Sequence, residues 1–267
     1  MKKKNFKILI TGGQGFIGLN LVKELRRDPK NKVVVYNRDV CQKIRIKNNF
    51  DIIFHLAANA DTRYLSDVEM YRNNILGFLN VLDFALKGKS KLIYASTAAM
   101  YGIYKKTAYA ESKIIGDEIA RHFFNKLPLV GLRFFNVYGP YEKQKGKMAS
   151  MITQWALQIK KGKRPVAFGK EDAKRDHIYV KDVVRALKIA IKKKNGIYDV
   201  GTGRAVTFDT VLENVQKALG TNLKPIYIKN PYKGAYQKYT RARLNWGFKP
   251  IYSLEQGIKD YLIKNFF

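Results

Sequence analysis

Short apolar runs alternate with longer, more polar segments over the first half of the chain. The runs fall at residues 7–10, 32–36, 51–58, 91–95 and 129–135. Apolar runs of about four to eight residues are typical of strands that are covered on both faces, as in a parallel sheet. The intervening segments, such as LNLVKELRR and ESKIIGDEIARHF, predict helices. Strands that alternate with helices in this way indicate an α/β fold built on a doubly wound parallel sheet.

The pattern changes after Tyr141. A basic loop, EKQKGK, precedes a predicted helix at about 148–161, and another apolar segment, RDHIYV, begins at Arg175. A helix and a final strand at 196–200 follow, and then a helix at 207–219. We therefore predict one domain formed by residues 1–140, with 176–200 returning to it, and a smaller C-terminal lobe formed by 141–175 and 201–267.

Composition narrows the class of protein. A chain of 267 residues with 46% apolar content can bury a sizeable core. The single cysteine, Cys41, excludes an intrachain disulfide and a multi-cysteine zinc site. The three histidines lack the spacing of metal ligands, so no metal site is expected. The basic head MKKKNFKILI has too short an apolar run for a signal peptide, and no run of about 18 apolar residues predicts a membrane span. A cytoplasmic protein is expected.

The charge balance is strongly basic. The chain has 51 Lys and Arg residues against 21 Asp and Glu residues, a formal net charge of +30. Such a charge attracts polyanions, so nucleic acid and a membrane surface are candidate partners. The excess is mostly lysine spread along the whole chain, and a bias toward lysine on solvated faces explains it as well. We favour the second interpretation.

A glycine-rich segment, TGGQGFIG, joins the first predicted strand to the first predicted helix. Gly12 permits the tight turn, Gly15 lets the backbone approach a pyrophosphate at the positive end of the helix, and Gly18 allows close packing of helix on strand. The second strand, at 32–36, comes at the distance expected for a dinucleotide-binding unit. This context favours dinucleotide binding over a generic glycine turn.

The end of the second strand indicates which dinucleotide is bound. In NAD sites an acid at this point holds the ribose 2′-hydroxyl. Here the strand is followed by Asn37 and Arg38, and Asp39 comes one residue too late. A guanidinium suits a 2′-phosphate, so we expect NADP in preference to NAD. The alternative is that Arg38 is one more solvated cation in a very basic chain.

The stretch from Lys91 to Lys113 carries the candidate chemistry. Thr97 follows a buried strand, at the point where a parallel sheet delivers side chains to a ligand crevice. Tyr109 and Lys113 are four residues apart on a predicted helix, so both lie on one face. A lysine cation beside a tyrosine stabilises the phenolate and lowers the tyrosine pKa from its ordinary value near 10. We therefore expect Tyr109 to be an acid/base group that Lys113 activates.

Two neighbouring segments complete the expected edge of the sheet. The third strand ends in HLAA, where small residues let a cofactor lie against the backbone. On the helix expected at 67–86, Asn73 and Asn74 are adjacent. Either amide is a helix-surface group or one that points at the sheet and positions the catalytic loop.

Six motifs occur in a fixed order along the chain: TGGQGFIG, HLAA, STAAMYG, YAESK, RFFNVYGP and RDHIYVKD. In kind and order they resemble those of the extended short-chain dehydrogenase/reductases, the NAD(P)-dependent sugar-nucleotide epimerases and dehydratases. The resemblance covers nearly the whole chain and implies a Rossmann fold, a C-terminal substrate lobe, a nucleotide-sugar substrate, a bound NADP used catalytically and a homo-oligomer. Within the family, FNVYGPYEKQKGKMAS, GTGRAVTF and KGAYQ are most similar to the heptose epimerases.

The resemblance also implies roles for individual residues. The catalytic positions are Thr97, Tyr109, the ribose-binding Lys113, and Lys145 as a second acid/base group. The cofactor-binding positions are Gly12, Gly15, Phe16, Ile17, Gly18, Asn37, Arg38, Leu56, Ala57, Ala58, Asn73, Tyr109, Lys113 and Val137. The substrate-binding positions are Asn136, Lys147, Gln154, Phe168, Arg175 and Tyr236.

Two of these assignments have structural alternatives. The Arg175 guanidinium suits a diphosphate, but it could instead form an ion pair with Asp176. Lys145 lies between Lys143 and Lys147 in a loop that could simply be solvated.

The chain departs from the family pattern at several points. About a dozen residues separate Thr97 from Tyr109, roughly half the usual spacing, and the segment between Arg38 and Asp51 is also short. Ala235 replaces a substrate-side arginine, and Gln154 stands where the family has a substrate histidine. These changes bear on which sugar is bound.

Three functions compete at this point. The first is a sugar-nucleotide epimerase, in which bound cofactor oxidises a carbinol carbon and returns hydride to its other face. The second is a sugar-nucleotide 4-epimerase, 4,6-dehydratase or ketoreductase that uses the same Thr-Tyr-Lys set. Ala98 and Ala99 stand where a dehydratase of this family carries an Asp-Glu pair, and this difference argues against dehydration. The third is a non-catalytic protein that binds a dinucleotide and RNA, against which the intact Thr-Tyr-Lys set argues.

Overall fold

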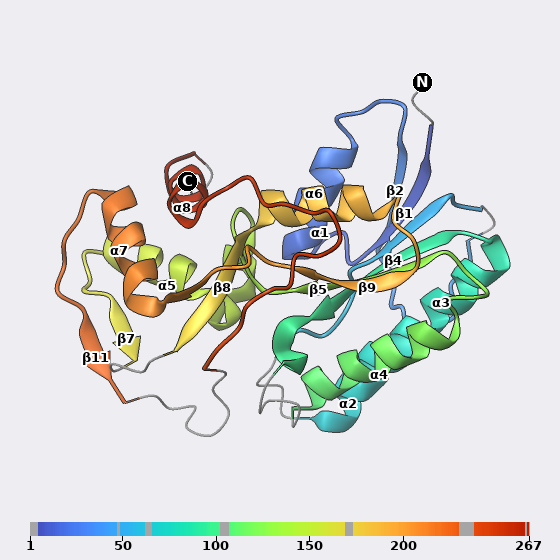
Figure 1. The fold of residues 1–267 in the computed structure, drawn as a ribbon, viewed down its shortest axis with the longest axis horizontal. Helices are drawn as coiled ribbons and strands as arrows, with labels where there is room; N and C mark the ends of the chain where they lie inside the picture. Colours follow the sequence, from blue (N-terminus) through green and yellow to red (C-terminus); the bar gives the residue numbers. More distant parts are fainter. Residues whose placement is uncertain are drawn as a thin grey trace.

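The structure is a computed structural model, and it describes residues 5–46, 49–61, 66–101, 107–168, 173–229, 238–264 and 266. Six parallel strands form the central sheet, in the order β2-β1-β3-β4-β5-β9 (Figure 1). Their bounds are β1 Lys7–Thr11, β2 Lys32–Tyr36, β3 Ile52–His55, β4 Lys91–Thr97, β5 Leu129–Phe134 and β9 Gly196–Val200. The predicted α/β fold with a doubly wound parallel sheet is confirmed.

Helices cover both faces of this sheet because successive strand residues point to opposite sides. Ile8 and Ile10 of β1 pack with Leu21 on one face, while Leu9 packs with Phe78 on the other. The bounds of the covering helices are α1 Phe16–Leu25 and α6 Val180–Ala190 on the first face, and α3 Gly77–Gly88 and α4 Ala108–His122 on the second (Figure 1). The strands are mostly apolar because the sheet is covered on both faces.

The helix expected at 67–86 is not continuous. It consists of α2, Asp67–Tyr71, a π-helical turn, Arg72–Leu76, and then α3. A π-helical turn adds a residue to the helical repeat and so changes which side chains face inward; such turns are frequent at functional sites. In this turn Asn74 is buried and Asn73 is half-buried.

The C-terminal part of the chain has its own small sheets and core. A three-stranded sheet has the order β10-β8-β6, and β11 pairs with β7. The bounds are β6 Asn136–Tyr138, β7 Val166–Phe168, β8 Lys174–Tyr179, β10 Ala205–Thr207 and β11 Ile226–Ile228. The helices are α5 Met151–Lys160, α7 Phe208–Leu219 and α8 Leu254–Lys264, and their core includes the fully buried Trp155, Tyr138, Tyr179 and Tyr261.

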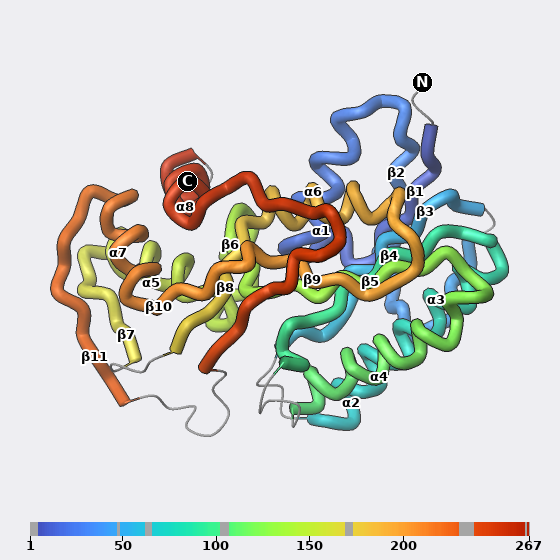
Figure 2. The backbone as a smooth tube through the Cα atoms, in the orientation of Figure 1, coloured from blue at the N-terminus to red at the C-terminus, as the bar shows by residue number. Residues whose placement is uncertain are grey.

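Two connections join this part to the central sheet. The segment before α8, in red in Figure 2, runs across both sheets: the Ala242 amide donates to Asp176 of β8, and the Arg243 amide donates to Asp199 of β9. In the other direction, β8 leads directly into α6, which packs on the central sheet. The domain boundaries drawn from the sequence stay a prediction. Among the described residues no helix is long and apolar enough to cross a membrane.

Candidate active site

The glycine-rich segment forms a turn that only glycine can adopt at two positions. Gly12 has φ +70°, and a Cβ added there would lie 2.4 Å from the Ala57 backbone nitrogen. A Cβ on Gly18 would lie 2.1 Å from the Gly12 carbonyl oxygen, so the start of α1 rests directly on the turn. Gly15 is exposed and caps α1 through its backbone. The turn leaves bare backbone at a helix N-terminus, a fit for the pyrophosphate of a dinucleotide.

The end of β2 presents Asn37 and Arg38, both exposed. The Asp39 carboxylate is engaged in its own turn, where it accepts the Cys41 amide at 2.9 Å. Arg38 is thus an exposed cation at the point where a dinucleotide places its adenosine ribose. Across the glycine turn, Leu56 and Ala57 are half-buried and Ala58 is exposed, so the end of β3 offers small side chains and backbone.

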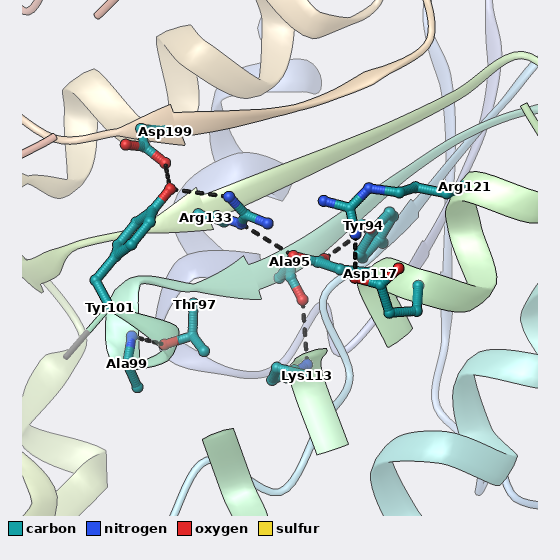
Figure 3. A network of polar contacts seen from close by, with 11 residues as sticks. Tyr94, Ala95, Thr97, Ala99, Tyr101, Lys113, Asp117, Arg121, Arg133 and Asp199 are labelled. Atoms are coloured by element: carbon teal, nitrogen blue, oxygen red, sulfur yellow. Dashed lines mark hydrogen bonds and ion pairs between the residues drawn. The ribbon is translucent and has the colours of Figure 1, made fainter. Parts of the chain in front are cut away.

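Thr97, Tyr109 and Lys113 come together at the carboxyl end of β4. Thr97 is buried, and its hydroxyl accepts the Ala99 amide at 3.1 Å, which begins a short 3-10 helix, Ala98–Met100 (Figure 3). The Thr97 side chain also hydrogen-bonds the Tyr109 phenol. Lys113 donates from Nζ to the Ala95 carbonyl at 3.1 Å (Figure 3). The sequence predicted this grouping; residues 102–106 lie outside the described residues.

The electrostatics of this group differ from the expectation. Burial raises the pKa of Tyr109 above its ordinary value, and the hydrogen bond from Thr97 opposes that shift only in part. Burial also lowers the pKa of Lys113 to about 8, against the opposing charge of Asp117. The prediction that Lys113 lowers the tyrosine pKa is wrong for this structure, because desolvation of the buried phenolate raises that pKa and the influence that opposes it is the hydrogen bond from Thr97. Near neutral pH Tyr109 is a phenol, ready to donate a proton.

Asn74 is the positioning amide that the sequence left undecided. Its Oδ1 accepts the Asn59 amide at 2.8 Å, and its Nδ2 donates to the Asn59 carbonyl at 3.1 Å and to Ser112 Oγ at 3.0 Å. Ser112 in turn donates to the Tyr109 carbonyl at 2.8 Å. One buried side chain thus links the loop after β3 to the helix that carries Tyr109 and Lys113.

The neighbouring Asn73, the residue assigned to the cofactor, has a different environment. Its side-chain oxygen lies 3.6 Å from Cys41 Sγ, beside the loop that follows β2. The π-helical turn separates the roles of these two amides, which a regular helical pattern does not reveal.

Lys145 lies in a 3-10 helical segment, Glu142–Met148, which is kinked at Gly146 and stands where the sequence predicted a basic loop. Its ammonium is 3.9 Å from the buried carboxylate of Glu142 and 5.7 Å from the centre of the Phe16 ring at the start of α1. The next side chain back, Gln144, donates to the Gln14 carbonyl at 3.3 Å. The lysine loop therefore rests on the glycine-rich segment. Lys143 instead donates to the Phe266 carbonyl, away from this contact.

Most of the remaining predicted site residues lie on β6, α5, β7 and the 3-10 segment after β6. The Asn136 amide donates to the Asp176 carbonyl at 2.9 Å, and the Gln154 amide donates to the Ala149 carbonyl at 2.7 Å. Lys147 is exposed, and Val137 and Phe168 are half-buried. Tyr236 lies outside the described residues.

Arg175 lies with its guanidinium 5.5 Å from the centre of the Phe208 ring. The adjacent Asp176 points to the other side of β8, where its carboxylate accepts the Thr202, Gly203 and Ala242 amides. The aspartate is thereby committed to holding two loops together. This arrangement argues against the alternative of an ion pair between Arg175 and Asp176.

Comparison with known proteins identifies related chains. The sequence profile described as the NAD dependent epimerase/dehydratase family matches residues 8–201. The ADP-L-glycero-D-manno-heptose-6-epimerase of Brachyspira hyodysenteriae is 32% identical, with 95% of this chain and 96% of that protein covered.

Solved structures give the same picture. The crystal structure of the Helicobacter pylori ADP-L-glycero-D-manno-heptose-6-epimerase is similar with a TM-score of 0.89 and 34% identity, over 98% of this chain and 97% of that one. A UDP-N-acetylglucosamine 4-epimerase from Methanobrevibacter ruminantium has a TM-score of 0.88 at 24% identity, over 97% and 98% of the two chains. The second likeness supports the fold alone.

Proposed function

The chain belongs to the NAD dependent epimerase/dehydratase family, and from this membership we propose that it is a nucleotide-sugar epimerase that inverts carbon 6 of an ADP-linked heptose. The observation that carries the proposal is similarity over nearly the full length of both chains to enzymes named for this activity, at 32% and 34% identity. Similarity of that extent includes the C-terminal part, where the substrate-binding residues are expected.

A bound nicotinamide would supply the redox chemistry, which is reversible hydride transfer at the carbinol carbon. The residues that would hold it are the glycine turn, the ends of β2 and β3, and Lys113 at the ribose. We propose NADP as the preferred form because Arg38 is exposed at the end of β2 and Asp39 is turned toward Cys41. A guanidinium there pairs with a 2′-phosphate, whereas NAD would call for a carboxylate.

Tyr109 and Thr97 would handle the proton of the reacting hydroxyl. The phenol is hydrogen-bonded to Thr97, so a substrate oxygen between them can pass its proton toward Tyr109 and receive one from it. The Lys113 ammonium, which donates to the Ala95 carbonyl, would stabilise Tyr109 by its charge when the phenol loses its proton.

Lys145 would serve the opposite face of the same carbon. An epimerase returns hydride to the other side of a carbonyl intermediate, so the oxygen of that intermediate points to a different acid. Lys145 is on a loop seated on the glycine-rich segment, and it is the lysine of that loop that lies at the start of α1. Its partial exposure leaves the ammonium able to reach a substrate.

Arg175 would bind the diphosphate, with Asn136, Lys147, Gln154, Phe168 and Tyr236 around the nucleotide and sugar. The cationic loop and Arg175 together suit a dianionic diphosphate bridge.

The experiment is incubation of the purified protein, loaded with NADP, with ADP-D-glycero-D-manno-heptose, followed by proton NMR of the sugar. The expected product is ADP-L-glycero-D-manno-heptose at an equilibrium mixture of the two epimers. UDP-glucose and UDP-N-acetylglucosamine serve as controls. Conversion of either control, with none of the heptose, would contradict the substrate assignment while leaving an epimerase.

A further inference from the structure

A chain of buried and half-buried charged and polar groups joins β4, β5, β9 and α4 beside Lys113 (Figure 3). Arg133 of β5 donates from Nε to the Asp117 carboxylate at 2.9 Å and from Nη1 to the Tyr101 hydroxyl at 2.8 Å. Tyr94 donates to the other oxygen of Asp117 at 2.8 Å. The Tyr101 hydroxyl donates to Asp199 of β9 at 2.7 Å.

These contacts leave the group with a surplus of negative charge. Two carboxylates, Asp117 and Asp199, share the single guanidinium of Arg133, directly in one case and through Tyr101 in the other. Asp117 has no exposed surface and Asp199 has 5%. A buried charge is costly unless another charge of opposite sign lies near it. Lys113 is the nearby cation that can balance the second carboxylate of this group.

Lys113 is placed to be that cation. It precedes Asp117 by four residues on α4, so both side chains lie on one face of the helix, and its ammonium is held at the Ala95 carbonyl of the adjacent strand. The other charged or titratable groups near it do not oppose this pairing. His55 of β3 is buried, hydrogen-bonded to Thr11 and neutral, because burial lowers its pKa to about 3. Arg121 of α4 is paired with Glu118.

We infer that Asp117 is a positioning residue for the reaction: with Arg133, Tyr101 and Asp199 it forms the buried counter-charge that holds the Lys113 ammonium beside Tyr109. The same group fixes the turn that bears Thr97, because Tyr101 ends the 3-10 helix that Thr97 begins. The inference rests on the proposed function, in which Lys113 must be cationic to act.

The effect on Lys113 has a definite sign. Burial lowers the pKa of Lys113 to about 8, and the Asp117 charge opposes that shift. Removing the charge should therefore lower the lysine pKa further, so that the cation is lost at a lower pH. For a buried pair within one helical turn, Coulomb's law predicts a change of about one pH unit or more.

The test measures Lys113 itself and needs no substrate. Competitive acetylation with acetic anhydride over a range of pH, followed by peptide mass spectrometry, gives the titration midpoint of an individual lysine. The variants are Asp117→Asn, which keeps the size of the side chain and removes its charge, and Tyr94→Phe, which removes a hydrogen bond to the same carboxylate and leaves the charge. The expected result is a midpoint lowered by about one unit or more in Asp117→Asn and unchanged in Tyr94→Phe.

Equal midpoints in wild type and Asp117→Asn would overturn the inference, and so would equal shifts in both variants, which would indicate a packing effect. If Asp117→Asn does not fold, Asp199→Asn replaces it; a smaller shift of the same sign is expected, and none would contradict the inference. Where the heptose is a substrate, the alkaline limb of the turnover profile should move with the midpoint. A shifted midpoint in a protein that does not convert the heptose would contradict the proposed function alone.

Discussion

The Asn74 amide donates to Ser112 Oγ at 3.0 Å, and through this contact the loop after β3 and the catalytic helix α4 are fixed relative to one another. Asn74 also makes a pair of hydrogen bonds with the Asn59 backbone, so a single buried side chain satisfies groups on two elements. Loss of this amide would leave the half-buried backbone groups of Asn59 without their partner.

Asn74→Ala should lower the free energy of unfolding by about 2 kcal/mol or more and reduce turnover, because the Tyr109 helix is released from the β3 loop. Urea denaturation and steady-state rates measure the two effects. The matched control is Asn214→Ala, which removes one hydrogen bond within α7 and should cost less than about 1 kcal/mol without changing turnover. Equal losses of stability and of turnover in the two variants would contradict the positioning role of Asn74.

Tyr109→Phe should keep the fold and the cofactor affinity but lower turnover by about 10²- to 10⁴-fold, the usual contribution of a general acid/base group. Within the part of the chain that the structure describes, the lost hydroxyl hydrogen-bonds Thr97, and the structural cost of losing that one contact is small. Circular dichroism, cofactor titration and turnover check the three parts. Near-normal turnover in this variant would contradict the proposal that Tyr109 transfers the proton.

Arg38→Ala should weaken NADP binding by about 10-fold or more, the value of one charge-assisted hydrogen bond pair, and leave NAD binding nearly unchanged. The wild type should bind NADP more tightly than NAD. Fluorescence titration of the stripped protein with both cofactors gives the four dissociation constants. An equal loss for NAD and NADP would remove the 2′-phosphate role of Arg38.

Lys145→Met should abolish epimerisation while NADP affinity stays within a few-fold, because the lysine serves only the second face of the reacting carbon. Lys143→Met is the matched control. Lys143 belongs to the same basic loop, but its ammonium contacts the Phe266 carbonyl and lies 4.0 Å from the centre of the Phe266 ring. It should lose little activity. Equal loss in both variants would reduce Lys145 to a part of a basic loop that attracts substrate.

Glu142 gives a prediction of stability against pH. Burial raises the pKa of this carboxyl above 4.5, in spite of Lys145 and the hydrogen bonds from Ser150 and Thr153. Between the unfolded pKa and the higher folded pKa, the native protein keeps a proton on Glu142 that the unfolded chain has lost. The stabilisation from this group is therefore full below about pH 4.5 and is lost as the pH rises through the folded pKa. Glu142→Gln removes the titration. The melting temperature of the variant relative to wild type should therefore rise between pH 4 and pH 7; a constant difference would contradict the assignment.

The sequence predicted most of the central sheet and the grouping of Thr97, Tyr109 and Lys113, because these depend on local periodicity and on a four-residue helical spacing. It left Asn73 and Asn74 unresolved, since a π-helical turn leaves no local signal in a regular helical pattern. It also did not reveal that Arg133 and Asp117 are partners, because that contact joins a strand to a helix and depends on the register of the whole sheet. The raised pKa of Tyr109 likewise depends on burial, which cannot be read from the four-residue spacing between Tyr109 and Lys113.

The most direct test of the account follows the hydrogen on carbon 6. ADP-D-glycero-D-manno-heptose carrying deuterium at that carbon is incubated in ordinary water with the NADP-loaded protein, and the epimerised product is examined by NMR and mass spectrometry. Transient oxidation with return of the same hydride predicts that the product retains its deuterium. Epimerised product that has exchanged deuterium for solvent hydrogen, or the absence of epimerised product, would contradict the account.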